Sequence, residues 1–223
     1  MQKLYYDFGY ASRADPLWDL SYELEPQKFP FRSERVAKCP ASIASYQHTF
    51  IARSSIDCDV YFDKPNKTMH SPTLGQYGFD WVFTCDDLDR LDEVDVITMQ
   101  INSPKYMFWT PRLAHKKNIQ IWLHDVPQQY LTEYRNWYVI QGMLPKNFIH
   151  REVNGAIALK PGENHFSLKR GEPLYAITIF CDEKVKLKRK EVPQEIWDNQ
   201  RRKSLMKMFC PYTYSKKIYE RFL

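Results

Sequence analysis

The sequence predicts a mainly β protein: an antiparallel β-sandwich or jelly-roll-like domain with a short helical appendage at the C-terminus. Short apolar or alternating segments, roughly ten of them, recur at spacings of about 8 to 15 residues, which is typical of sandwiches and barrels. Aromatic residues make up 15% of the 223-residue chain, and 14 prolines stand against 7 glycines. This composition favours short strands joined by proline-bearing loops over glycine-rich nucleotide-binding turns. The hydrophobic content of 43% suffices for a core.

The clearest strand covers residues 174–181, LYAITIFC. They are rich in β-branched and aromatic residues, and apolar residues occur at both odd and even positions. A strand covered on both faces has this pattern. The turn RGEP precedes it, and Gly171 suits the positive φ of such a turn. Three polar residues follow it, and residues 185–188 then alternate apolar side chains with Lys186 and Lys188. The sequence therefore predicts a hairpin whose second strand exposes a lysine-bearing face, a common protection of a sheet edge.

The remaining strands follow from the same patterns. Residues 56–63, IDCDVYFD, alternate apolar with polar side chains and predict a half-buried strand. Residues 68–78 are polar and predict a loop. Further strands are predicted at 46–53, 79–83, 95–101, 106–109, 119–123, 137–140 and 149–159.

The chain divides by composition into three parts. Residues 1–35 alternate aromatic with charged side chains and predict an N-terminal aromatic arm against the body, with strands of a first sheet as the alternative. Residues 36–192 hold the predicted strands of the β-sandwich domain. Residues 193–223 are a basic C-terminal helix or tail, because Pro193 suits the first turn of a helix and Glu195 complements the dipole at its N-terminus.

Positive charge is concentrated at the C-terminal end. Residues 183–223 carry 12 lysines and arginines against 5 carboxylates, whereas residues 1–182 carry 20 against 22. Clustered cations suit an acidic protein surface, or a nucleic-acid backbone whose counterions they release. We expect a protein partner, with nucleic acid as the alternative. The predicted partner-binding residues are Lys186, Lys188, Arg189, Lys190, Arg201, Arg202 and Lys203.

The sequence contains none of the catalytic patterns GxSxG, GxxxxGK, GxGxxG and HExxH. One arrangement matches part of a non-haem iron site, which takes two histidines and one carboxylate. His150 and Glu152 have the spacing that puts two side chains on one face of a strand. His165 would be the third ligand, but its GENHFS setting predicts a turn. We therefore expect no cofactor, and a metal-dependent, jelly-roll oxygenase-like enzyme is the alternative function.

Three tryptophans, Trp109, Trp122 and Trp137, lie on predicted strands. They are candidates for an aromatic cleft that binds a sugar or a peptide by stacking, although packing in the core is the commoner role of such residues.

The five cysteines are widely spaced and include no CxxC pair, which predicts reduced thiols rather than a zinc site or a disulfide framework. No segment approaches the roughly 18 apolar residues of a membrane span. The N-terminus also lacks the apolar core of a signal peptide. We therefore expect a soluble, cytoplasmic protein without membrane contact.

The segments KCPA with HTFIARSSIDCDVYFD, then MQINSPKYMFWTP, then FSLKRGEPLYAITIFCDEKVKLKR occur in this order. Together they resemble an uncharacterised family of hypothetical proteins from tailed bacteriophages and bacteria, in which a late RGEPL strand is the most specific element. The resemblance covers roughly residues 36–190 and implies a phage or prophage setting, in the host cytoplasm or the virion. Because the family has no assigned reaction, the resemblance adds no activity. We therefore predict a non-enzymatic binding or structural module of phage type that engages a protein partner.

Overall fold

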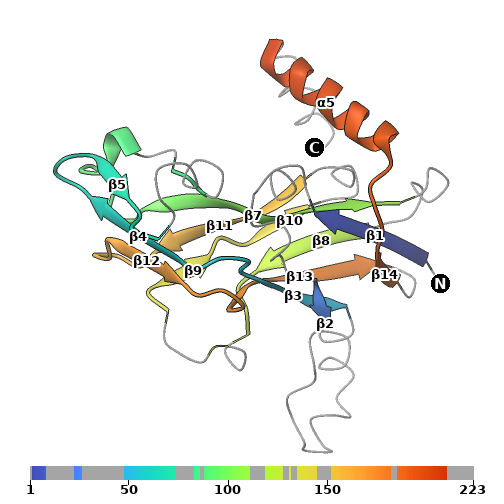
Figure 1. The fold of residues 1–223 in the computed structure, drawn as a ribbon, viewed down its shortest axis with the longest axis horizontal. Coiled ribbons are helices and arrows are strands. Elements are labelled where there is room, and N and C mark those ends of the chain that lie inside the picture. The colour runs from blue at the N-terminus through green and yellow to red at the C-terminus, as the bar shows by residue number, and fades with distance from the viewer. Residues whose placement is uncertain are drawn as a thin grey trace, which may run out of the picture.

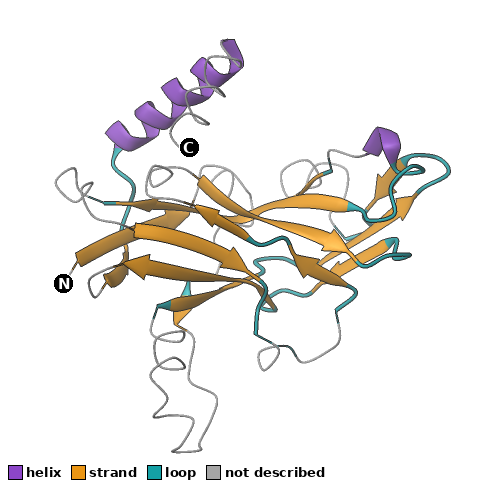
Figure 2. Cartoon of the chain, turned by 180° about the vertical axis from the view of Figure 1, so that it is seen from behind, coloured by secondary structure: helices purple, strands orange, loops and turns teal. Residues whose placement is uncertain are grey.

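The computed structural model describes residues 2–8, 23–26, 48–73, 83–85, 88–110, 119–127, 131, 135–144, 152–181 and 185–209. These residues form three β-sheets, a short 3-10 helix, η2 (Leu88–Arg90), and one α-helix, α5 (Gln194–Phe209), at the C-terminal end (Figure 2). The predicted mainly β class with a short C-terminal helix is therefore confirmed. The two larger sheets pack on one core, as in a sandwich, but their strand order does not establish a jelly roll.

The largest sheet has six strands. Its order is β14 (Val185–Arg189), β1 (Gln2–Phe8), β7 (Thr98–Trp109), β11 (Glu152–Leu159) and β9 (Trp137–Val139), and β6 (Phe83–Thr84) also pairs with β7. Within this sheet β14 and β1 are parallel, and the other described pairs are antiparallel.

The other two sheets are antiparallel. The five-stranded sheet has the order β10 (Gly142–Leu144), β8 (Ile119–His124), β13 (Pro173–Cys181), β3 (Thr49–Arg53) and β2 (Glu25–Pro26). The three-stranded sheet has the order β12 (His165–Leu168), β4 (Cys58–Asp63) and β5 (Thr68–His70).

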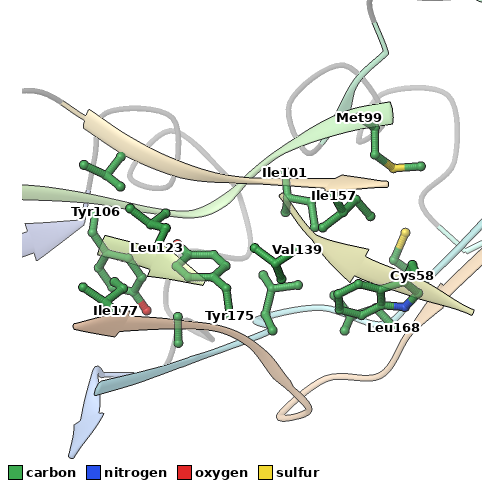
Figure 3. Close-up of a cluster of buried hydrophobic side chains, with 14 of the residues drawn as sticks. Cys58, Met99, Ile101, Tyr106, Leu123, Val139, Ile157, Leu168, Tyr175 and Ile177 are labelled. Atoms are coloured by element: carbon green, nitrogen blue, oxygen red, sulfur yellow. The ribbon is translucent and has the colours of Figure 1, made fainter. Parts of the chain in front are cut away.

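One hydrophobic core connects the three sheets (Figure 3). Ile157 reaches it from the six-stranded sheet, Ile177 from the five-stranded sheet and Cys58 from the three-stranded sheet. Tyr106 and Tyr175 lie fully buried in this core. Alternation along each strand explains the arrangement, because every second side chain points to the same face.

The predicted hairpin at residues 174–188 is wrong in its pairing. The turn before it is confirmed, since Gly171 has a φ of 79°. β13, however, lies between β3 and β8 in the five-stranded sheet, whereas β14 pairs with β1 in the six-stranded sheet. The chain therefore crosses from one sheet to the other between these strands. The apolar β13 occupies an interior position with a neighbour along each edge, and the lysine-bearing β14 takes the end of the described strand order.

β7 runs continuously through Pro104, where the sequence suggested two separate strands. Proline is tolerated here because the pairing of β7 with β11 is irregular. Its register shifts between Val153, which is opposite Tyr106, and Gly155, which is opposite Ile101. Pro104 lies within this irregularity, so the N–H that it lacks breaks no regular ladder.

Three further strands lie where the sequence suggested an arm, a loop and a turn. Of the two alternatives for residues 1–35, residues 2–8 take the second, since β1 is an interior strand of the six-stranded sheet. Residues 68–70 form β5 and not a loop. The predicted turn around His165 is wrong, because β12 begins at His165 and pairs with β4.

The predicted C-terminal helix is confirmed as α5, which begins directly after Pro193. Its first turn packs on the six-stranded sheet, where Ile196 and Trp197 lie against the buried Trp109 and Val192. Beyond this turn the helix extends away from the sheets (Figure 1). Among the described residues there is no helix that is long and apolar enough to cross a membrane.

Candidate functional site

An apolar patch lies on the outer face of the five-stranded sheet. Met143 on β10 is opposite Trp122 on β8, and the Trp122 ring stacks on that of Phe180 on β13 with 6.2 Å between centroids. Met143 is 53% exposed and Phe180 43% exposed, and Trp122 is half-buried between them. On β8 and β13 the intervening side chains face the core, so alternation directs Trp122 and Phe180 outward. Met143, opposite Trp122, points the same way. We call Met143, Trp122 and Phe180 the apolar patch.

A chain of hydrogen bonds supports this patch from the neighbouring strands. Oγ1 of Thr49 lies 2.7 Å from Oγ1 of Thr178, which lies 2.8 Å from Nε2 of His124. Nδ1 of His124 lies 2.8 Å from the carbonyl oxygen of Asp125. Because a carbonyl only accepts, Nδ1 carries the proton. In the neutral imidazole, which the lowered pKa of His124 favours, Nε2 then accepts from Thr178, and Thr178 accepts from Thr49. His124 is therefore held as one neutral tautomer, with its ring 4.1 Å from that of Trp122.

This arrangement makes folding sensitive to acid through His124. Burial, only partly opposed by the Asp125 carbonyl and carboxylate, lowers the pKa of His124 below its unfolded value of about 6.5. The contribution of neutral His124 is fully present above that unfolded pKa and is lost as the pH falls towards the folded pKa, since the unfolded state then binds the extra proton. We expect the urea midpoint of unfolding to decrease as the pH is lowered from 7.5 to 5.5, and to decrease less in His124→Gln.

Measuring both proteins at the same pH values separates His124 from the other titrating groups, which the variant leaves in place. Glutamine keeps a side-chain oxygen that can accept from Thr178, so the comparison isolates the titration. Parallel pH profiles of the urea midpoint for the two proteins would contradict the assignment.

The structure places the three predicted cleft tryptophans in different surroundings. Trp137 is buried in the main core, where it packs on Phe166 and its Nε1 donates to the carbonyl of Ser167 at 3.3 Å. Trp109 is buried in a separate cluster beneath the start of α5. Trp122 is half-buried on the outer face of the five-stranded sheet, where its neighbours are Met143 and Phe180 rather than the other two tryptophans.

The predicted basic residues divide into two groups. Lys186 and Lys188 are exposed on the outer face of β14, and Lys186 lies alongside exposed Lys3 of β1. Among the described residues, none of these three lysines forms an ion pair. We call Lys3, Lys186 and Lys188 the basic edge. Arg202 is exposed on α5, while the side chains of Arg201 and Lys203 lie outside the described part of the chain.

Arg189 and Lys190 instead hold the N-terminal strand. Nη1 of Arg189 lies 3.1 Å from a carboxylate oxygen of Glu23, and its Nε lies 3.6 Å from Oδ1 of buried Asp7. The Lys190 ammonium lies 5.4 Å from the ring of Tyr5, which stacks on Trp109 at 4.6 Å. These two cations therefore have intramolecular partners, whereas Lys186 and Lys188 of the basic edge have no ion-pair partner among the described residues.

The structure does not bring Glu152 and His165 together. Glu152 is opposite Met107 in the six-stranded sheet and lies 3.8 Å from the ammonium of Lys105. His165 is in the three-stranded sheet, with Nε2 3.3 Å from Oδ1 of Asp59. His150 lies outside the described residues. Within the described part of the chain, no group of three or more potential ligands could hold a metal ion.

Among the described residues, Cys58, Cys85 and Cys181 form no disulfide bond. Burial and the nearby carboxylate of Asp59 raise the pKa of the Cys58 thiol, which disfavours the thiolate at neutral pH. Cys58 is therefore a core residue rather than a nucleophile.

Sequence reasoning identified Trp122 but missed Met143 and Phe180. Phe180 was assigned to a strand buried on both faces. The available signal was the polar residue Thr178, because residues two apart share a face and Phe180 therefore points the same way as Thr178. Met143 had no signal of its own, since only the pairing of β10 with β8 places it beside Trp122.

Comparison of the chain with protein-family models, with curated proteins and with solved structures found no match.

Proposed function

We propose that this protein is a non-enzymatic binding module, of phage type as the sequence resemblance implies, which engages a protein partner through the apolar patch. The observation that carries the proposal is an exposed methionine and two stacked aromatic rings on three neighbouring strands. Tryptophan, phenylalanine and methionine are enriched in protein interfaces, and aromatic anchors contribute most of the binding energy there.

The patch is supported by a rigid base, which favours binding. Thr49 and Thr178 are buried, and their hydrogen bonds to His124 fix the ring that packs on Trp122. A preorganised surface loses less conformational entropy when a partner binds.

The basic edge supports a second candidate, contact with a nucleic-acid backbone. Three neighbouring lysines project outward with no described acidic partner, and such cations bind phosphates with release of counterions. The two surfaces lie on the outer faces of different sheets, whose inner faces share the core. One partner of ordinary size would therefore centre on one surface or the other. We favour the apolar patch as the surface for a protein partner, because tryptophan, phenylalanine and methionine are enriched in protein interfaces whereas lysine is depleted there.

The oxygenase alternative has no comparable support. Glu152 and His165 lie in different sheets, and each pairs with another side chain. A facial triad needs its three ligands on one metal ion.

The proposal is tested by affinity capture of the full chain from expressing or infected cells after nuclease treatment, followed by binding measurements with the purified partner. We expect Phe180→Glu to weaken binding at least tenfold, because a carboxylate would have to be desolvated in the apolar interface. Tyr138→Glu is the matched control, since Tyr138 is 41% exposed on β9 of the other large sheet.

A reproducible partner whose affinity falls only in Phe180→Glu supports the proposal. Equal affinities of Phe180→Glu and the unaltered protein would overturn it. A parallel capture without nuclease gives the other decisive result. The proposal would also be overturned if that capture recovered nucleic acid and no protein, and if the Lys186→Glu/Lys188→Glu variant no longer recovered the nucleic acid. That second result would assign the function to the basic edge.

A further inference from the structure

The outer face of the three-stranded sheet carries a different chemistry from either surface above. Val60, Phe62 and Phe166 point into the core, so alternation turns the intervening side chains outward. This sheet lies at the end of the molecule away from β1 and β14 (Figure 1). The outward residues are all polar or aromatic: Asp59, Tyr61, Asp63, His165, Ser167, Thr68 and His70.

Three rings form a column across this face. His165, Tyr61 and His70 are directly opposite one another on β12, β4 and β5. The Tyr61 ring stacks on that of His165 with centroids 4.2 Å apart and planes at 10°, and on that of His70 at 5.3 Å and 17°. Asp59 anchors His165 at one end of the column. His70 ends the column on β5, where its side chain is exposed and one ring face is left uncovered by Tyr61.

A pocket of about 450 Å³ adjoins the column, within the size range of small-molecule sites. Its lining includes Tyr61, His70, Asp63, Lys64 and Asn164. Two hydrogen bonds from Asn66 lower the pKa of the Asp63 carboxyl, so it is ionised at neutral pH. Each carboxylate oxygen keeps a lone pair for another donor, and the amide of exposed Asn164 offers both a donor and an acceptor.

The same geometry argues against an ionic ligand. Asp59 and Asp63 are about 13 Å apart along an extended strand, and the two histidines lie on opposite sides of Tyr61, so they do not share one cation. An anion would be repelled by the Asp63 carboxylate, and the Lys64 ammonium that could offset this charge donates one of its three hydrogen bonds to the Val94 carbonyl at 3.0 Å. The pocket therefore suits a neutral ligand that is rich in hydroxyl groups.

We propose that this face binds a neutral saccharide, with a sugar ring against the open face of His70 and its hydroxyl groups hydrogen-bonded to Asp63 and Asn164. The partly positive C–H groups of a sugar face complement the negative face of an aromatic ring. The sugar hydroxyls complement a carboxylate acceptor and an amide. This site is independent of the proposed protein partner, because it uses none of the residues of the apolar patch.

The experiment is a screen of the full chain against an array of neutral oligosaccharides of glucose, galactose, mannose and N-acetylglucosamine, with sulfated and carboxylated sugars alongside. Calorimetric titration with the strongest binder follows. We expect His70→Ala and Tyr61→Ala each to weaken binding at least tenfold. The control is Tyr138→Ala, which removes a tyrosine of similar exposure from another sheet and is expected to bind within twofold of the unaltered protein. Phe180→Glu is expected to bind the sugar normally, which keeps this test separate from that of the protein partner. Circular dichroism and urea midpoints establish that each variant is folded.

Failure to bind any neutral oligosaccharide on the array would overturn the proposal. Binding that survives in both His70→Ala and Tyr61→Ala would also overturn it. Binding of sulfated or carboxylated sugars alone, with loss in Lys186→Glu/Lys188→Glu, would assign the interaction to the basic edge instead.

Discussion

Gly155→Ala is expected to destabilise the protein by about 3 kcal/mol, because it forces a methyl group into a filled part of the core. A Cβ at this position would lie 2.8 Å from Cδ1 and 3.0 Å from Cε1 of Tyr175. The Tyr175 ring is fully buried and its hydroxyl donates to the Pro104 carbonyl at 3.0 Å, so it has no room to withdraw without losing that bond. The loss of unfolding free energy is measured from the shift of the urea midpoint, with the slope of unfolding free energy against urea concentration unchanged.

Gly142→Ala is the matched control, since no atom lies within 4 Å of a Cβ added there. We expect it to change the free energy of unfolding by less than about 0.5 kcal/mol. In the double variant Gly155→Ala/Tyr175→Leu the ring carbons that cause the clash are gone, so its cost should be smaller than the sum of the single changes. Similar midpoints for Gly155→Ala and Gly142→Ala would show that the clash does not exist.

Arg135→Ala is the second large effect, an expected loss of about 3 kcal/mol. Arg135 is only 7% exposed, and its guanidinium lies 4.1 Å over the ring of Trp137. Nη1 donates to the carbonyl of Leu174 at 3.3 Å, and Nε lies 3.4 Å from Oε1 of Glu172. Alanine would remove the packing on Trp137 and leave the buried carbonyl without this donor.

Arg135→Met is expected to recover most of that loss and to cost about 1 kcal/mol or less. The guanidinium is imperfectly satisfied, because Nε and Nη2 have no hydrogen-bond partner within the described residues, and the Nε contact with Glu172 has ion-pair distance only. Burial accordingly lowers the pKa of Arg135, against the opposing effect of Glu172 and Asp125. Methionine keeps the apolar stem on Trp137 without a buried charge.

Urea denaturation of both variants, with Arg202→Ala as an exposed arginine control, distinguishes packing from charge. If Arg135→Met were as destabilised as Arg135→Ala, the charge rather than the side-chain stem would be the stabilising element. We expect Arg202→Ala to stay within about 0.5 kcal/mol of the unaltered protein.

Many strands could be predicted because their signals are local. The alternation in residues 56–63 corresponds to β4, and the apolar run at 174–181 corresponds to β13. Pro193 and Glu195 located the start of α5. β12 carried a usable alternation as well, with Phe166 and Leu168 inward and His165 and Ser167 outward, but the polar residues before it led to the prediction of a turn.

Strand pairing was much less accessible, as β14 illustrates. A three-residue connection permits a hairpin, yet β14 lies beside β1, from the opposite end of the chain. Nothing in either segment encodes that neighbour. Parallel pairing with an interior N-terminal strand depends on which combination of sheets closes the core, and only long-range packing selects it.

The candidate sites show the same division. The lysines of β14 were identified from the sequence, but the sequence could not separate exposed Lys186 from Arg189, which Asp7 and Glu23 engage. The predicted tryptophan cleft did not anticipate that Trp109 and Trp137 lie in separate buried clusters.

The sequence by itself determined the β class, the positions of most strands, the C-terminal helix and the uneven charge, because periodicity, turn residues and composition act over a few neighbouring residues. The tertiary structure alone decided that Trp122 joins Met143 and Phe180, and that Tyr61 lies between two histidines. Each of these surfaces joins three strands, at least one of which is distant along the chain from the other two. A residue's cross-strand neighbours depend on sheet order and register, which are set by burial of the whole core and not by the segment that carries the residue.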